Sequence, residues 1–179
     1  MKKAALLIAF CVITTIACKS GPTQQVSSVV AAVPSPSTVK ATGYVNDDAN
    51  VIDEATRKQL VTTLAALKER RKIDFSVVTV KSTGDKSVAD YSLALARERK
   101  KDSIEANVSG LLLLVAVDDR NWHIQISNNL EPHLTKELLT NLSTPMTDAF
   151  RQKQYGEGIR KYVNAIIEKL DQLDIPGQV

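Results

Sequence analysis

Cys18 has the most distinctive chemistry in this chain, because its thiol directly follows the small residue Ala17. The segment before it combines two lysines near the N-terminus with an apolar run over residues 4–13. A short positive segment, an apolar core and a small residue before the cleavage point are typical of a secretory signal, and the run is too short for a transmembrane helix. We therefore predict that residues 1–17 are a signal peptide that directs the protein out of the cytoplasm.

The sequence around Cys18 resembles the lipobox of bacterial lipoproteins, in which a small residue precedes a cysteine that is acylated and becomes the new N-terminus. Ile16 and Ala17 suit the positions before the cysteine, whereas Thr15 stands where Leu is usual. The resemblance implies a palmitate-bearing lipoprotein of the bacterial cell envelope that faces the periplasm. Lys19, rather than Asp, favours the outer membrane if the cell is Gram-negative. An ordinary signal cleaved near Ala17 and an uncleaved anchor are the alternatives.

The charge and cysteine content of the mature chain limit its partners. The formal net charge of +3 includes two lysines of the signal, so it falls to about +1 when residues 1–17 are removed. The basic runs at 68–72 and 97–101 are typical of solvated helix ends, and no dense Lys/Arg face is left for nucleic acid. Because the second cysteine, Cys11, lies in the signal, the mature chain cannot form an internal disulfide.

The composition then divides the mature chain into two regions. Residues 19–42 are rich in Ser, Thr, Pro, Gln and Val and contain no aromatic residue. Such a segment buries too little apolar surface to offset its ordering entropy, so we predict that residues 18–42 are a lipidated Cys18 followed by a flexible tether. Residues 43–175 have the length of one domain with its own core.

Apolar periodicity predicts the elements of this domain. Asp53 is a plausible N-cap for the first helix, and Ser87 for the second. The order expected is a helix (54–71), a strand (73–80), a helix after Ser87, strands at 111–117 and 122–127, and helices at 135–142, 144–152 and 155–173. This order predicts an α/β/α sandwich, with a small mixed, partly parallel sheet of about four strands and helices on both faces. The two strands joined through a helix are expected to be parallel, and the hairpin adds an antiparallel partner.

Several segments along this domain carry a resemblance to a known family. They are Gly43-Tyr44-Val45-Asn46-Asp47, residues 75–80, residues 110–120, Leu130-Glu131 and residues 149–158. Together, and in this order, they resemble the TPM domain over residues 43–170. That family includes a thylakoid acid phosphatase, a photosystem II repair factor and many bacterial envelope proteins.

The resemblance implies a site of acidic residues at one edge of the sheet, which in some members binds calcium or another divalent cation. The corresponding residues here are Asp47 in the N-terminal loop, Asp118 and Asp119 at the end of the central strand, and Glu131. Carboxylates at the carboxyl end of a parallel strand lie where open α/β sheets bind ligands, and they are hard donors for Ca²⁺ or Mg²⁺. The alternative is that Asp118-Asp119 and Asp47 belong to plain turns.

Three triplets depart from the family pattern. Members usually have an acidic or amide residue with Gly where this chain has residues 108–110. They usually have a Gly-Tyr-Gly stretch at the place of residues 127–129, and Leu-Thr-Asp at the place of residues 134–136. Lys136 replaces an anion with a cation, while Asn128 and Asn129 keep oxygen donors and tolerate a left-handed turn. These departures favour a degenerate site.

Two functions remain after the common catalytic motifs are excluded. The chain has no His-Glu-x-x-His, no phosphate-cradling glycine loop and no Gly-x-Ser-x-Gly elbow. One function is an accessory module that binds an unidentified envelope protein during assembly or maintenance at the membrane. The other is a divalent-metal-dependent acid phosphatase, in which a cation held by the carboxylates would polarise a phosphomonoester and activate water. The sequence leaves open whether the protein is an enzyme.

Overall fold

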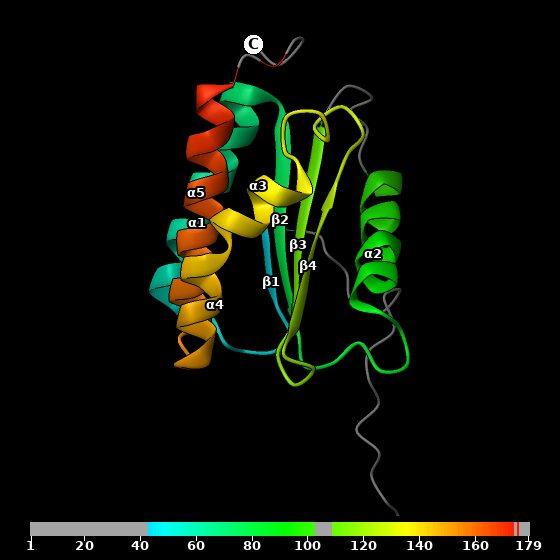
Figure 1. Cartoon of the computed structure of the whole chain (residues 1–179), viewed down its shortest axis with the longest axis vertical. Helices are drawn as coiled ribbons and strands as arrows, with labels where there is room; N and C mark the ends of the chain where they lie inside the picture. Colours follow the sequence, from blue (N-terminus) through cyan, green and yellow to red (C-terminus); the bar gives the residue numbers. More distant parts are fainter. Residues whose placement is uncertain (1–42, 103–108, 174, 176–179) are drawn as a thin grey trace, which may run out of the picture. The chain divides into compact units, whose positions relative to one another are not determined.

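The computed structural model describes residues 43–102, 109–173 and 175 of the 179-residue chain (Figure 1). The predicted signal peptide, Cys18 and the tether lie outside these described residues. The described elements are, in chain order, β1 (Val45–Asp47), α1 (Glu54–Arg71), β2 (Ile73–Val80), α2 (Val88–Asp102), β3 (Ser109–Ala116), β4 (Asn121–Ile126), α3 (Lys136–Leu142), α4 (Thr144–Arg151) and α5 (Tyr155–Gln172). Among the described helices, none has both the length and the apolar content needed to span a bilayer.

The four described strands form one open mixed sheet in the order β1-β2-β3-β4. β1, β2 and β3 are parallel, and β4 pairs antiparallel with β3. Figure 1 shows α2 on one side of the sheet and α1, α3, α4 and α5 on the other. The predicted α/β sandwich with a mixed sheet is therefore confirmed.

β1 is the one described strand that the element prediction does not contain. Residues 45–47 pair in parallel with residues 77–79 of β2, so Asp47 ends a strand and does not lie in a loop as expected. Three residues are too few for an alternating pattern to be recognised. The strand forms because β2 offers a free edge, where the Val77 amide donates to the Tyr44 carbonyl at 2.8 Å.

Side-chain alternation along β2 and β3 creates a core on each side of the sheet. The larger core contains Phe75 and Leu113 together with residues of α1 and α5, and the smaller one packs Val78 and Leu114 against Tyr91 of α2. β3 is buried on both faces, as its continuous apolar run predicts. The carboxyl ends of β1, β2 and β3 consequently meet at one edge of the sheet, which is called the carboxyl end below.

Helix α1 is fixed at both ends. The Asp53 side chain accepts a hydrogen bond from the Thr56 amide at 2.9 Å, which caps the first turn. The helix ends at Lys72, which takes the left-handed conformation with φ 52°. Next to it, the Arg71 guanidinium donates to the Leu170 and Leu173 carbonyls at 2.8 and 2.7 Å. These bonds join the end of α1 to the end of α5.

Candidate functional site at the carboxyl end of the sheet

Asp47 uses both carboxylate oxygens to organise the loop between β1 and α1. Its Oδ1 accepts from the Val51 amide at 3.1 Å and from the Thr79 hydroxyl, and its Oδ2 accepts from the Ile52 amide at 2.9 Å. Because Thr79 belongs to β2, the carboxylate ties the loop to the sheet. Most of its capacity to accept hydrogen bonds is used by the fold itself.

Asp118 and Asp119 form the tip of the β3–β4 hairpin, where the Arg120 amide closes a turn on the Val117 carbonyl at 3.2 Å. Asp119 accepts from the Thr83 amide at 2.8 Å and the Ser82 hydroxyl at 2.7 Å. These bonds, the Thr83 amide first, hold the pKa of Asp119 below its usual value. Asp118 is exposed, and its carboxylate has no partner among the described residues. Asp119 thus anchors the turn that leads to α2, and Asp118 points to solvent.

Asp48 is an acidic residue at this edge that the family resemblance does not include among the site residues. Burial, together with the charge of Asp47, raises its pKa above the usual value. Its own charge contributes, after burial, to the raised pKa of Tyr91 in α2. The charge of Asp48 thus acts on Tyr91 of α2, whereas Asp47 bonds to the loop that enters α1. The tandem Asp47-Asp48 was the available signal for this arrangement.

Glu131 lies at the opposite end of the sheet from Asp118. β4 runs antiparallel to β3, so Ile126 pairs with Leu111, and the Ser127 amide donates to the Gly110 carbonyl at 2.9 Å. The 8 residues of β3 separate the two ends by roughly 25 Å at about 3.3 Å per residue. Glu131 is thus too far away to share an ion with the hairpin carboxylates.

The four predicted ligands do not fit a single calcium or magnesium centre. Asp47, Asp118 and Asp119 share the carboxyl end, but Asp47 and Asp119 are engaged by amides and hydroxyls of two different loops. A shared cation would have to compete with those donors, and it needs six or more convergent oxygens if it is calcium. Within residues 43–102 and 109–173, no group of three or more His, Cys, Asp or Glu side chains is arranged to hold a metal.

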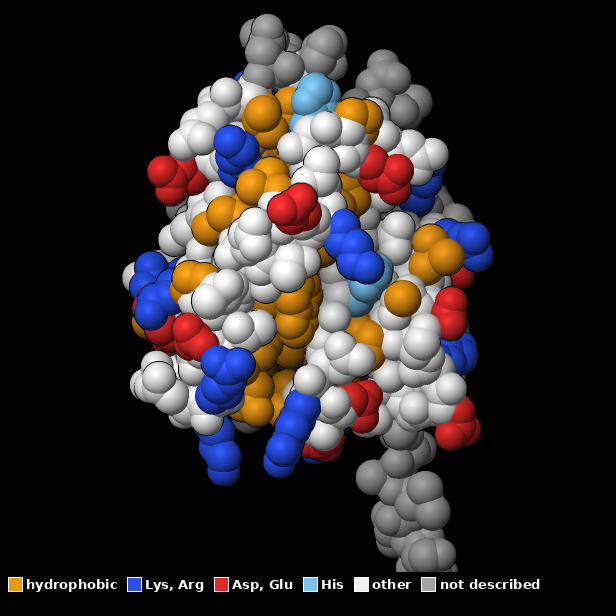
Figure 2. Space-filling model, viewed as in Figure 1, with side chains coloured by type: hydrophobic (Ala, Val, Ile, Leu, Met, Phe, Trp, Pro, Cys, Tyr) orange, Lys and Arg blue, Asp and Glu red, His pale blue; other side chains and the backbone are white. Residues whose placement is uncertain are grey.

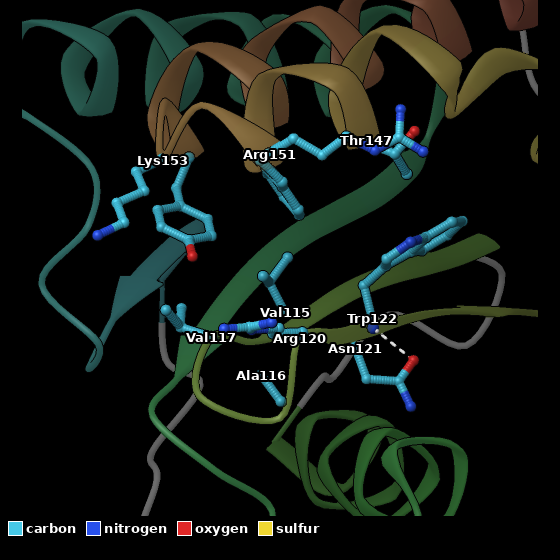
Figure 3. Close-up of a pocket in the computed structure, with 11 residues that line it drawn as sticks. Val115, Ala116, Val117, Arg120, Asn121, Trp122, Thr147, Arg151 and Lys153 are labelled. Atoms are coloured by element: carbon cyan, nitrogen blue, oxygen red, sulfur yellow. Dashed lines mark hydrogen bonds between the residues drawn. The ribbon is translucent and has the colours of Figure 1, made fainter.

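A cavity of about 490 Å³ opens beside the hairpin, between the sheet and the junction of α4 with α5. Its lining residues are Val115, Ala116, Val117, Arg120, Asn121, Trp122, Thr147, Phe150, Arg151, Lys153 and Tyr155. In Figure 3, Val115 and Trp122 project from the sheet toward the helix that carries Arg151. Figure 2 shows hydrophobic side chains exposed along a hollow on this face, with Lys and Arg side chains on both sides of its lower end. We call it the basic cavity.

The apolar part of the basic cavity is built from aromatic contacts. Trp122 packs edge-to-face on Tyr162, with ring centroids 5.5 Å apart and an interplanar angle of 68°. Phe150 and Tyr155 form a tilted pair with centroids 5.1 Å apart. Trp122 therefore packs against Tyr162 and also forms one wall of an accessible cavity.

The cationic part is unusual in its backbone. Arg120 and Lys153 have φ of 51° and 59°, the left-handed region in which Gly is common and other residues are strained. Lys153 ends α4 in a Schellman motif, because its amide donates to the Phe150 carbonyl and the Gln154 amide to the Ala149 carbonyl, at 2.9 and 3.0 Å. Both cations therefore project from sharply fixed turns.

Comparison with known proteins identifies the family. The family model described as the TPM domain matches residues 45–169. The chain belongs to the TPM domain family. The resemblance noted in the sequence is thereby confirmed. Comparison with curated proteins gives no match.

Solved structures share the fold of this TPM domain. The N-terminal domain of a protein from P. gingivalis is 30% identical, with 78% of this chain and 89% of that chain covered and a TM-score of 0.66. The BA42 protein from Bizionia argentinensis is 16% identical, with 68% and 82% covered and a TM-score of 0.57. The N-terminal domain of the cg2496 protein from Corynebacterium glutamicum is 15% identical, with 71% and 79% covered and a TM-score of 0.53.

Two of the triplets that depart from the family pattern contact each other in this TPM domain. The Asn129 amide group donates to the Ser109 hydroxyl, and the Ser127 hydroxyl donates to the Asn129 side-chain oxygen at 2.6 Å. The Gly110 amide donates to the Ser127 hydroxyl at 3.0 Å. The substitutions therefore form a hydrogen-bonded clamp at the end of the sheet remote from Asp118. Their chemistry is that of a structural link between β3 and the loop after β4.

Proposed function

We propose that this TPM domain is an accessory module, tethered to the membrane of the bacterial cell envelope, that binds an envelope protein during its assembly or maintenance. The observation that carries the proposal is the contrast between the acidic residues and the basic cavity. The carboxylates of Asp47 and Asp119 are bonded within the fold, while the accessible hollow at the same edge offers cations and aromatic rings. Such a surface suits ligand binding more than metal-assisted hydrolysis.

The predicted tether favours action close to a membrane. If residues 19–42 form the flexible chain that their composition predicts, these 24 residues would have a root-mean-square span of roughly 25–30 Å, from about 5–6 Å times the square root of the length. A lipid on Cys18 would therefore keep the domain within reach of the exposed parts of membrane proteins. The proposed partner is such a protein rather than nucleic acid.

The anchor is tested by fractionation of cells that express the full chain. Wild-type protein is expected in the membrane fraction, and the outer membrane is expected to carry it in a Gram-negative host. Cys18→Ser should be released or should persist as a precursor of higher mass. Soluble wild-type and variant proteins of equal mass would contradict lipidation.

The phosphatase alternative is tested on the full chain with a generic phosphomonoester at acid and neutral pH, with and without millimolar Ca²⁺ or Mg²⁺. We expect no turnover and little change in thermal stability with either ion. An ion that binds tightly to the native state alone would raise the thermal stability. Asp118→Asn is the informative variant, because this carboxylate is exposed and has no described partner. Turnover that Asp118→Asn abolishes would overturn the accessory function in favour of a phosphatase.

A further inference from the structure

The basic cavity has two chemically different zones that lie within one hollow. Its more buried lining, called the floor below, contains Val115, Val117 and the rings of Trp122, Phe150 and Tyr155, and its exposed lining, called the rim, contains Arg120, Arg151 and Lys153. A ligand that fills it must therefore join an anionic group to an apolar body. The volume of about 490 Å³ suits the end of a peptide or a small molecule and excludes a folded element.

The rim keeps a net positive charge. Arg151 forms an ion pair with Asp148 one turn earlier in α4. Arg120 and Lys153 have neither an ion pair nor a side-chain hydrogen bond among the described residues. The neighbouring carboxylate of Asp119 is directed to Ser82 and Thr83, away from α4. Two exposed cations of the lining, Arg120 and Lys153, thus have no ion pair among the described residues.

The position of these two cations is set by the backbone. Arg120 follows a hairpin turn and Lys153 follows a Schellman motif, and both hold the left-handed conformation at a cost of about 1 kcal/mol relative to Gly. Gly would serve either turn without strain, so the fold keeps a charged side chain at two places where its backbone does not need one. The two turns come from segments more than 30 residues apart, and they meet only at the cavity.

We propose that the basic cavity binds the free C-terminal carboxylate of a polypeptide whose last side chain is apolar or aromatic. The α-carboxylate and the side chain of a terminal residue leave the same carbon, which matches a cationic rim next to an apolar floor. Charge-assisted hydrogen bonds from Arg and Lys would hold the carboxylate, and ring contacts would hold the side chain. Capture of chain termini is a recurring mode of peptide recognition. This inference rests on the accessory function proposed above and names the chemistry of the partner.

The chain contains its own reporter for this binding. Trp122 is its single tryptophan, and its ring lines the cavity. The test titrates the purified full chain with a short neutral peptide that ends in phenylalanine, as the free acid and as the C-terminal amide, and follows tryptophan fluorescence. The free-acid peptide is expected to bind about tenfold more tightly than the amide. Added salt is expected to lower the affinity for the free-acid peptide.

Variants at the two strained turns separate binding from folding. Arg120→Gly and Lys153→Gly each remove a cation from a turn that Gly fits, so both variants should fold. Each substitution should lower the affinity for the free-acid peptide about threefold to tenfold. Lys72→Gly is the matched control, because Lys72 has the same backbone conformation at the end of α1 and does not line the cavity. It should bind the acid as the wild type does.

Four outcomes would overturn the inference. They are equal affinity for acid and amide, unchanged affinity in the Arg120→Gly, Lys153→Gly double variant, displacement of the peptide by inorganic phosphate at equal concentration, and binding of the full chain to phosphatidylglycerol vesicles without binding of the peptide. Failure of the peptide experiment without phosphomonoester turnover would refute this inference alone. Turnover dependent on Asp118 would refute the accessory function whether or not the peptide binds.

Discussion

Two acidic and two basic residues at the carboxyl end of the sheet differ in what they contact. Asp47 and Asp119 accept hydrogen bonds from amides and hydroxyls of neighbouring loops, whereas Arg120 and Lys153 have no described side-chain partner. The sequence pattern indicates the carboxylates as site residues, whereas the structure indicates the cations. A charged side chain that completes the fold is less available to a ligand, so the contacts of each residue decide its role more than its charge does.

The largest expected effect concerns Asp47. Asp47→Ala would leave the Val51 and Ile52 amides and the Thr79 hydroxyl without their acceptor, which should lower the free energy of unfolding by about 3 kcal/mol. Urea denaturation of the full chain measures this loss. Asp47→Asn keeps one acceptor oxygen and should lose about half as much. A loss below about 0.5 kcal/mol for Asp47→Ala would remove the structural role from this carboxylate.

Gly158 tests whether the basic cavity depends on the packing of α4 against α5. A Cβ at this position would lie 3.0 Å from the Met146 carbonyl oxygen and 3.0 Å from the ring of Phe150. Gly158→Ala should therefore destabilise the protein by about 1–3 kcal/mol and shift the fluorescence of Trp122 as the cavity wall moves.

Gly110→Ala is the matched control, since a Cβ there meets nothing within 4 Å. It should leave both stability and fluorescence close to those of the wild type. Equal behaviour of the two alanine variants would show that the helix contact does not set the shape of the cavity.

Replacing Asp119 should cause a smaller loss of stability, and this loss should depend on pH. Asp119→Asn weakens the bonds to Ser82 and Thr83 and should cost about 1 kcal/mol at neutral pH. Because the folded-state pKa lies below 3.8, the stabilisation is complete above that value and is lost as the pH falls through the folded pKa.

Chemical denaturation from about pH 7 to about pH 3 should therefore show wild type and Asp119→Asn converging at the acid end. Asp118→Asn should change stability little at any pH, because its carboxylate has no partner among the described residues. A larger loss for Asp118 than for Asp119 would reverse the roles assigned to the two.

The smallest effect is a gain in stability at the cationic turns. Arg120→Gly, Lys153→Gly and Lys72→Gly each relieve a left-handed backbone, and each should raise the free energy of unfolding by about 0.5 kcal/mol after the entropy of the unfolded glycine is counted. Calorimetry of the three variants measures this. A loss of stability specific to the two cavity residues would mean that their side chains support the fold.

Local signals in the sequence were enough to predict most of the fold. The helix at 54–71 and the strand at 73–80 are found with the predicted bounds, because an N-cap and a β-branched alternation mark them. β1 could not be found, since its three residues form a strand only where β2 provides a partner. Local pattern decides long elements, and tertiary pairing decides short ones.

The candidate site was less predictable for a similar reason. The strand ends do bring Asp47 and Asp118 to one edge, as expected from parallel strands. Glu131 is separated from them because it follows β4, which runs antiparallel to β3, and the predicted hairpin already implied this separation. The basic cavity depends on the left-handed turns at Arg120 and Lys153, and neither residue type signals that conformation.

The link between α1 and α5 has a consequence for the order of folding. α5 contributes eight buried residues, and its end receives the two hydrogen bonds of Arg71, so α1 has no complete packing partner until α5 has been made. Synthesis proceeds from the N-terminus, and this domain of the nascent chain therefore keeps an open core until α5 emerges. For an exported lipoprotein, as proposed here, this delay would keep the polypeptide unfolded while it passes through a membrane channel. The domain would then fold after the polypeptide has crossed the membrane.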